Sequence, residues 1–359
     1  MFIRGVDQCV SSGIISLRIH GVSARVFVGD EGLFRELSIE LLHFIVNPPD
    51  DDRPEITVHF QEYCSVAFSK AEIKRIRSLK KIRLTAEIEN YSDVAQLTTY
   101  LFARKGWNPD EAVILVLSQL AYLLRLTLSQ KYDVAVFHGA SLSYGGQGIL
   151  FVGQSGAGKT SLSYLCARQG FQYLSDEDSF VLFDTARRVC TLLGFQRRLR
   201  LHSLMPYRAG SGHSSRGQFS GFGEQGMVYD PRQDCANAYC LRAPLKKIII
   251  LNNHRQNARL TFQKIPAEQR FFQLLKYFES ATVEYSNGRD LITRYNRRGF
   301  DLVSLIARSY DIYFLNYDFR KHSFELPFKV KAALSSSEIG EENNYVQAIP
   351  RFVDTGILV

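Results

Sequence analysis

The stretch that decides the fold is residues 149–178, ILFVGQSGAGKTSLSYLCARQGFQYLSDED. It contains a short apolar run, a glycine-rich turn, a helix-compatible run and a second apolar run, in that order. Short apolar runs bounded by turn residues indicate buried strands, and Gly170 stands where helices commonly end. The stretch therefore predicts a strand over 149–152, a helix from about 160 to 169, and a strand over 171–174.

The turn inside this unit, residues 153–160, reads GQSGAGKT and fits the pattern GxxxxGK[ST]. Glycines let such a backbone curl around a polyphosphate, and the helix that follows points its positive end at the same anion. In this pattern Lys159 reaches the β- and γ-phosphates, and the Thr160 hydroxyl ligates Mg²⁺. We therefore expect a nucleotide-phosphate site, with a chance glycine-rich turn as the alternative. Its predicted residues are Gly153, Ser155, Gly156, Ala157, Gly158, Lys159, Thr160 and Ser161.

Three acids, Asp176, Glu177 and Asp178, end the stretch. A right-handed crossover would make the two strands parallel, so that the acids and the glycine-rich turn share one edge of the sheet. A carboxylate there can accept a proton from an attacking hydroxyl or hold a metal ion. The alternative is that these acids only cap the next element or face solvent, and this alternative applies above all to Asp178.

Residues 138–178 resemble the catalytic domain of the HPr kinase/phosphorylase family and its kinase-like relatives, whose phosphate loop is of the phosphoenolpyruvate-carboxykinase type. The resemblance rests on the His138-Gly139-Ala140 entry, the turn at Gly145-Gly146, the GQSGAGKT loop, the Arg168-Gln169-Gly170 helix end, and an acid only 17 positions after Lys159. Most P-loop NTPases place the corresponding acid much further along the chain. The resemblance implies an α/β (or α+β) fold with a P-loop kinase core of the HPr kinase C-terminal-domain type.

By position, the resemblance makes Asp176 the base that activates a serine hydroxyl. It makes Lys159 and Thr160 the phosphate and magnesium residues, and His138 a nearby histidine that influences proton transfer. Glu177 stands where bacterial HPr kinases have a second Asp, and it is the second candidate metal ligand.

One family segment, the later Glu-Ile-Arg-Gly with its metal-binding Glu, has no counterpart in this sequence. Glu224 or Asp230 could replace that Glu. The chain therefore looks more like the divergent HPr-kinase-like proteins, some of which phosphorylate a serine of a peptide.

The leading hypothesis is a kinase that uses ATP and Mg²⁺ to phosphorylate a hydroxyl, with a serine of a protein or peptide as acceptor. The second is a nucleotide-binding regulatory module with little or no phosphoryl transfer. The third, an NTPase acting on nucleic acid, rests only on the net charge of +8, and we expect no nucleic-acid partner. The family resemblance also implies a homo-oligomer.

The rest of the chain suggests three parts: an N-terminal α/β module over 1–105, a catalytic domain over 106–330, and a polar tail over 331–359. Alternating apolar residues predict strands within 14–27 and 55–68, with a helix over 31–46 between them. Asn108-Pro109-Asp110-Glu111 is a strong helix start.

The helix that starts there contains the apolar stretch 112–128, which includes Arg125. It is shorter than a typical membrane span of about 20 residues, so we expect a buried core helix and no membrane partner. The six cysteines lack CxxC spacing and no signal peptide is visible, so we expect reduced thiols in a cytoplasmic protein.

Two further segments contain arginines that are candidates for contact with a phosphate or a substrate. On a strand, Arg198 and Arg200 would share one face and could meet a phosphate or an acidic substrate, or could simply be solvated. Residues 206–226 predict a long Gly- and Ser-rich loop, and its Arg208 and Arg216 are candidates for a lid over the nucleotide.

Overall fold

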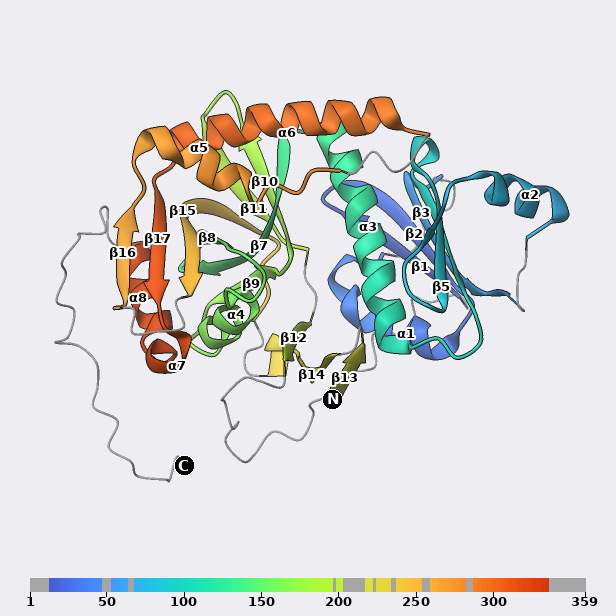
Figure 1. Ribbon diagram of the computed structural model, residues 1–359, viewed down its shortest axis with the longest axis horizontal. Coiled ribbons are helices and arrows are strands. Elements are labelled where there is room, and N and C mark those ends of the chain that lie inside the picture. Colours follow the sequence, from blue (N-terminus) through green and yellow to red (C-terminus); the bar gives the residue numbers. More distant parts are fainter. Residues whose placement is uncertain are drawn as a thin grey trace.

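The protein is a mixed α/β structure with two large sheets and a small three-stranded sheet, as Figure 1 shows for the computed structural model. This agrees with the α/β class expected from the sequence. Arg208 and Arg216 lie outside the described residues, as does the tail beyond residue 335. The structure describes residues 13–46, 53–63, 68–195, 198–202, 217–221, 224–233, 237–253, 259–281 and 287–335.

The first sheet belongs to the N-terminal third of the chain. Its hydrogen-bonded order is β1-β2-β3-β6-β5-β4, in which only the β2–β3 and β3–β6 pairs are parallel. Its strands are β1 (Ile14–Ile19), β2 (Val22–Val28), β3 (Ile56–Glu62), β4 (Lys81–Arg83), β5 (Ile88–Asp93) and β6 (Thr98–Ala103). Its connections contain α1 (Glu31–Glu40), η1 (Leu42–Phe44), α2 (Lys70–Ser78) and η3 (Val94–Gln96).

The second sheet has the order β11-β10-β7-β8-β15-β17-β16, and β11 also pairs with β15, so that the sheet curls back on itself. The short strand β9 pairs with β7 next to β10. Its strands are β7 (Val134–Tyr144), β8 (Gln147–Val152), β9 (Gln172–Ser175), β10 (Asp178–Asp184), β11 (Val189–Leu193), β15 (Arg242–Asn253), β16 (Thr261–Lys264) and β17 (Ile312–Tyr317).

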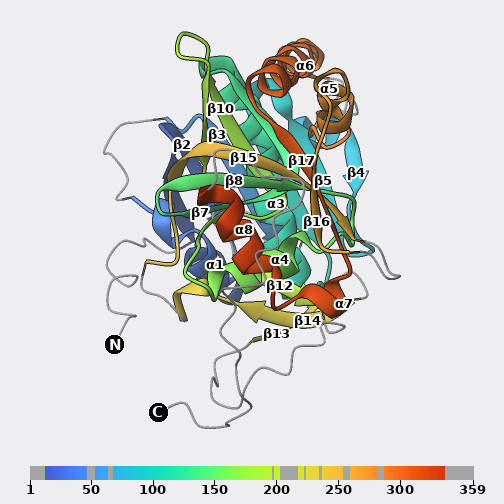
Figure 2. The same ribbon diagram turned by 90° about the vertical axis from the view of Figure 1, so that its left-hand side faces the viewer.

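Helices cover both faces of the second sheet, which Figure 2 shows edge-on. One face buries a core shared with α4 (Lys159–Ala167) and α8 (Leu326–Ser335), and α7 (Phe319–His322) lies beside them. The other face packs against α5 (Ala267–Leu275) and α6 (Arg289–Ser309). Because α8 ends at Ser335, the first residues of the predicted polar tail are helical.

The helix α3 (Pro109–Lys131) stands between the two sheets (Figure 1). Its Asn108 cap accepts hydrogen bonds from the backbone of Asp110 and Glu111, as the sequence predicted. It is long and apolar enough to cross a membrane, yet 78% of that apolar window is buried inside the protein, as expected of a core helix.

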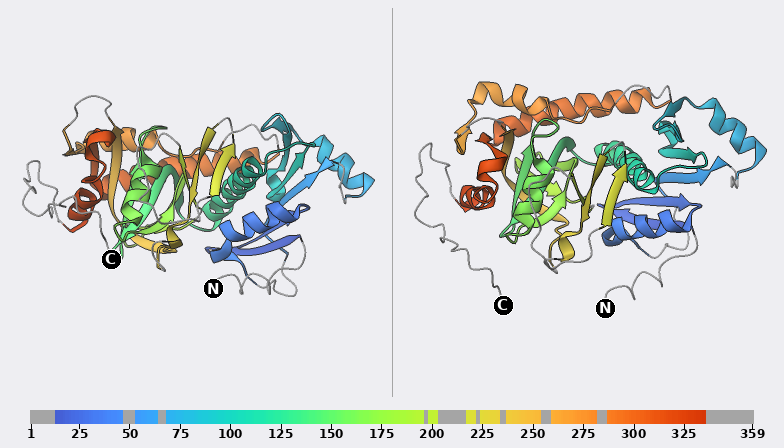
Figure 3. Two further views of the ribbon diagram at one scale, coloured as in Figure 1. Left: turned by 90° about the horizontal axis from the view of Figure 1, so that it is seen from below. Right: turned by 60° about the horizontal axis from the view of Figure 1, so that its bottom comes forward.

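One hydrophobic core runs from the first sheet through α3 into the second sheet: Val58, Leu120 and Val136 all belong to it. The long helix α6 bridges the same two halves, as both views of Figure 3 show, and its Ile292 packs in one cluster with Val94 and Leu126. The division of the chain into domains at residues 105 and 106 therefore stays a prediction.

A third sheet forms in the segment that the sequence predicted to be a loop. Its order is β12-β14-β13, so residues 217–221 and 224–226 are strands, and the prediction of one loop over 206–226 was wrong for them. These residues form strands because their backbones pair with one another in an antiparallel sheet. Strand formation depends more on such pairing partners than on local composition, so the Gly- and Ser-rich composition did not reveal it. The elements are β12 (Leu199–His202), β13 (Gly217–Gly221), β14 (Glu224–Tyr229) and the turn η4 (Pro231–Gln233).

A ladder of three rings crosses the first sheet on the face turned away from α3. The ring of His59 stacks on Phe27 at 4.6 Å and on Tyr100 at 4.9 Å between centroids. Burial lowers the pKa of His59 from its usual 6.5 to about 4, against an opposing contribution from the charge of Glu72.

This histidine makes stability depend on pH. Between pH 6.5 and 4 the unfolded chain binds the His59 proton and the folded chain does not, so the contribution is complete above pH 6.5 and is lost as the pH falls. We expect the loss to reach about 3 kcal/mol at pH 4. Urea unfolding at several pH values measures it, with His59→Phe as the reference because this variant keeps the ring stack. If the unfolding free energy of the unmodified protein and of His59→Phe changed with pH in the same way, the low pKa of His59 would be contradicted.

Candidate nucleotide site

The phosphate-loop sequence forms the expected turn between β8 and α4. The loop packs so closely on the sheet that a Cβ at Gly153 would lie 3.2 Å from the carbonyl oxygen of Leu251. Gly158 caps α4 at a φ of +95°, where a side chain would be strained and would press on the Tyr317 hydroxyl. The loop thus requires small residues at both ends.

The hydroxyl of Tyr317, at the carboxyl end of β17, donates a hydrogen bond to the backbone carbonyl of Ala157. This contact fixes the middle of the loop to the sheet. Ser155 and Gly156 are exposed at the tip of the loop, and Ser161 is half-buried in the first turn of α4. The first backbone N–H groups of a helix have no partner within the helix, so the start of α4 can receive an anion.

The ammonium of Lys159 lies within the curve of this loop. It donates hydrogen bonds to the backbone carbonyls of Gly153 at 2.9 Å and Gln154 at 3.3 Å, and the residue is only 7% exposed. Burial lowers the pKa of Lys159, and the nearby charges of Asp176 and Glu177 act against this shift. The positive charge therefore lies between the loop and the acids.

The acids lie where the crossover argument placed them. Strands β8 and β9 are both antiparallel to β7, so they run parallel to each other in one sheet, with β7 between them. The Thr160 hydroxyl at the start of α4 donates a hydrogen bond of 2.7 Å to the carboxylate of Asp176 just after β9. The predicted magnesium residue and the predicted base are therefore in direct contact.

A tight turn separates the three acids. The amide of Asp178 bonds the carbonyl of Asp176 at 3.0 Å across Glu177, whose φ is +72°. Such a γ-turn at a residue other than glycine is strained, by about 1–3 kcal/mol. It leaves Asp176 and Asp178 buried and Glu177 exposed. The charge of Glu177 acts to raise the pKa of Lys159 and of His138, so this carboxylate is near both groups.

A buried arginine holds the end of this turn. Arg125 of α3 bonds the carboxylate of Asp178 at 3.0 Å and that of Glu279 at 3.4 Å. Burial acts to lower the pKa of Arg125, but the charges of Asp178 and Glu279 raise it overall. Asp178 thus lies in a buried ion pair, so the alternative of a solvated or merely capping acid was wrong for this residue.

His138 lies beside the same network. Its Nδ1 is 3.5 Å from a carboxylate oxygen of Glu279, and the backbone of His138 pairs with Asp178. Burial lowers the pKa of His138, and the charge of Lys159 adds to this effect while Glu279 opposes it. The imidazole is therefore neutral at pH 7 and can accept or relay a proton.

Sequence reasoning missed the roles of Arg125 and Glu279. Arg125 carried a usable signal, because a charge inside an apolar helix requires a buried partner. Glu279 follows α5 and carried none, since nothing local distinguishes it from a surface acid.

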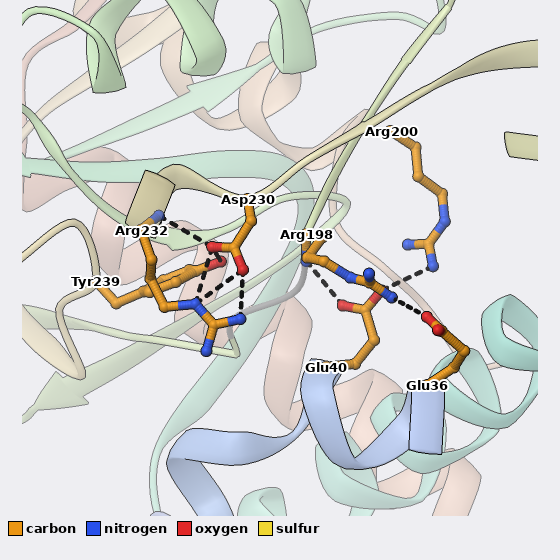
Figure 4. Close-up of polar contacts among 7 residues, drawn as sticks. All are labelled: Glu36, Glu40, Arg198, Arg200, Asp230, Arg232 and Tyr239. Carbon is orange, nitrogen blue, oxygen red and sulfur yellow. Dashed lines mark hydrogen bonds and ion pairs between the residues drawn. The ribbon is translucent and has the colours of Figure 1, made fainter. Parts of the chain in front are cut away.

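The structure does not bring the other predicted charges to this site. Arg198 and Arg200 both bond Glu40 of α1, at 3.1 and 3.0 Å. Arg198 also bonds Glu36, and Figure 4 shows how these side chains lie. They share one face, as predicted, but their partners are carboxylates of this chain. The alternative of a solvated face was therefore wrong, and the expectation of a phosphate or an acidic substrate gains no support from these pairs.

Asp230, one candidate for the late metal-binding acid, is bound by Arg232 and Tyr239 (Figure 4). Burial acts to raise the pKa of Asp230, but hydrogen bonds from Arg232 lower it overall. Its carboxylate therefore serves a local ion pair. The other candidate, Glu224, has its backbone in β14, and its side chain lies outside the described residues.

Comparison with known proteins does not establish a family. No family model matches the chain, and no curated protein sequence matches it. A search of solved structures gives the HPr(Ser) kinase/phosphatase from Coxiella burnetii, with a TM-score of 0.30 and 10% sequence identity over 55% of this chain and 94% of that chain. A similarity this low does not show a common fold, so the resemblance of residues 138–178 stays a prediction.

The buried pair of Arg125 and Asp178 can be tested by stability. Arg125→Met leaves the buried carboxylate of Asp178 and the partly exposed carboxylate of Glu279 without this cation, and we expect a loss of about 3–5 kcal/mol in the free energy of unfolding. Urea denaturation measures this. The matched control is Arg298→Met, which removes the more exposed pair with Asp133 and costs less than about 1 kcal/mol. Equal losses of unfolding free energy in the two variants would show that the buried pair contributes no more to stability than the exposed one.

Proposed function

We propose that this protein is an ATP- and Mg²⁺-dependent kinase that transfers the γ-phosphoryl group to a hydroxyl. The observation that carries the proposal is the 2.7 Å hydrogen bond from Thr160 to Asp176 at the mouth of the phosphate loop. It joins a residue that ligates magnesium in such loops to a carboxylate positioned to accept a proton.

The residues fit the groups that this reaction needs. The loop tip is open at Gly156, where no atom would lie within 4 Å of an added Cβ, so a polyphosphate can approach its backbone. Thr160 and Glu177 supply the oxygen ligands that Mg²⁺ prefers, and in phosphate sites one or two carboxylates suffice. When bound, the ion would neutralise charge on the phosphate oxygens.

The chemistry assigned to the chain is simple. The oxygen of the acceptor hydroxyl forms a bond to the γ-phosphorus, and the carboxylate of Asp176 accepts the proton of that hydroxyl. The bond between the γ-phosphorus and the bridging β-phosphate oxygen breaks, which releases ADP. Lys159 moves from its loop carbonyls to the β- and γ-phosphates and stabilises their charge. Neutral His138 would take part in the subsequent transfer of the proton to solvent.

The acceptor in this proposal is a serine of a protein or peptide. Support comes from the resemblance of residues 138–178 to HPr-kinase-like proteins, since serine is the acceptor of that family. A cytoplasmic location and a homo-oligomeric state rest on sequence arguments alone and stay predictions.

A second candidate is a nucleotide-binding regulator with little or no phosphoryl transfer. It is favoured by the pairing of Asp230 with Arg232, which leaves the late metal-binding acid of the family without a clear replacement among the described residues.

Two substitutions separate the roles in the proposed kinase. Asp176→Asn still accepts the Thr160 hydrogen bond, so it should keep ATP affinity within about threefold while phosphoryl transfer falls about 10²- to 10⁴-fold. Lys159→Ala removes charged hydrogen bonds to the phosphates and should weaken ATP binding about 10- to 100-fold. Calorimetry measures binding, and γ-³²P label on an acceptor serine measures transfer.

The controls are Asp301→Asn and Lys276→Ala, which make the same chemical changes at exposed positions of α6 and just after α5. Both should behave as the unmodified protein. Undiminished transfer by Asp176→Asn would exclude this residue as the base. ATP binding that depends on Lys159 without any label on protein or peptide would instead favour the regulator.

A further inference from the structure

A second polar site lies in the N-terminal module, on the face of the first sheet opposite α3. Alternation along β2 and β3 points Val26 and Val58 into the core and Arg25 and His59 to this other face. There the structure has a cavity of about 530 Å³, within the range of ligand sites. Nothing in the proposed kinase chemistry uses it.

Three arginines line this cavity, each from a different segment: Arg25 from β2, Arg53 just before β3, and Arg75 from α2. The acid among the described lining residues is Asp93, which bonds Arg75 at 2.9 Å and also receives a hydrogen bond from Asn287. The formal charge of the described lining residues is therefore positive, because the low pKa of His59 keeps its ring neutral at pH 7. Such a site attracts anions.

The ring ladder of Phe27, His59 and Tyr100 contributes to the cavity lining. Neighbouring rings are nearly parallel, with interplanar angles of 12° and 6°, so their faces are turned toward one another across the strands. Both faces of the His59 ring are therefore covered, so it presents its edge to the cavity, and the guanidinium of Arg75 lies over the ring of Tyr100. Ring edges carry partial positive charge and suit carboxylate oxygens, whereas nucleic-acid bases stack on exposed ring faces.

The shape of the lining indicates an extended ligand. Lining residues come from β2, β3, β6 and β5, which are successive neighbours in the sheet. Three inter-strand spacings amount to about 14 Å, the length of about four residues of extended chain. Two of the three arginines are exposed at the rim, so the site is an open groove rather than an enclosed pocket for a small anion.

We propose that this groove binds an acidic segment of a polypeptide, about four residues long in extended form, through Arg25, Arg53 and Arg75. The proposal does not depend on kinase activity, because the groove lies apart from the phosphate loop. Carboxylates of the peptide would pair with the arginine rim, and its backbone would hydrogen-bond to the polar side chains Thr57 and Thr98.

Binding of a fluorescein-labelled hexaglutamate peptide to the full-length protein, followed by fluorescence anisotropy, tests this directly. We expect saturable binding that weakens with added NaCl. The double variant Arg25→Gln/Arg53→Gln should weaken it at least about fivefold, which is the effect of two partly exposed ion pairs. Thr57→Glu keeps all three arginines and should weaken binding similarly by adding a like charge.

The matched control is Arg18→Gln, because Arg18 lies on the same face of the neighbouring strand β1 but does not line the cavity. Its affinity should stay within twofold of the unmodified protein. An equal loss in this control, or no peptide binding at all, would overturn the proposal. Tighter binding of hexathymidylate or of inorganic phosphate that depends on the same arginines would assign the groove to nucleic acid or to free anions, and would overturn it as well.

Discussion

The candidate site depends on one buried cation. The guanidinium of Arg125 is fixed between Asp178 and Glu279, and it joins α3 to the strained turn that presents Asp176. A buried charge of this kind is costly unless it is fully paired, so it tolerates few arrangements of its neighbours. The contact that it imposes at Asp178 limits how far Asp176, two residues earlier, can move from Thr160. Positioning of the proposed base is thus a consequence of packing between sheets.

A second set of contacts connects the N-terminal module to this ion-pair network. Tyr295 of α6 donates a hydrogen bond to the carbonyl of Glu279, and the start of α6 contacts the first sheet, where Asn287 bonds Asp93 and Gly288 packs on Val94. A Cβ at Gly288 would lie 2.7 Å from Val94, so this close contact requires glycine. The module is therefore built into the support of the site.

Contacts between residues close in sequence could be predicted, whereas contacts between residues far apart in sequence could not. The strand, glycine loop, helix and second strand over 149–178 depend on neighbours close in sequence, and each formed within a few residues of its expected bounds. The bond between Thr160 and Asp176 spans 16 positions, and crossover geometry predicted that the loop and the acids would share one edge of the sheet, though not the bond itself. The partners of Arg125 lie 53 and 154 positions away, so no periodicity or motif pointed to them.

Charged residues were the least predictable part for a related physical reason. Arg198 and Arg200 alternate on a strand in the manner of a ligand-binding face, yet they neutralise Glu40, whose side chain is fully buried. A sequence shows that a strand carries arginines, but not whether a helix more than 150 positions away buries a carboxylate against them. An unpaired buried carboxylate is costly, so a fold that buries one also places a cationic side chain such as arginine against it. A site keeps a net positive charge only where its arginines outnumber such acids, which is why charge has to be counted site by site.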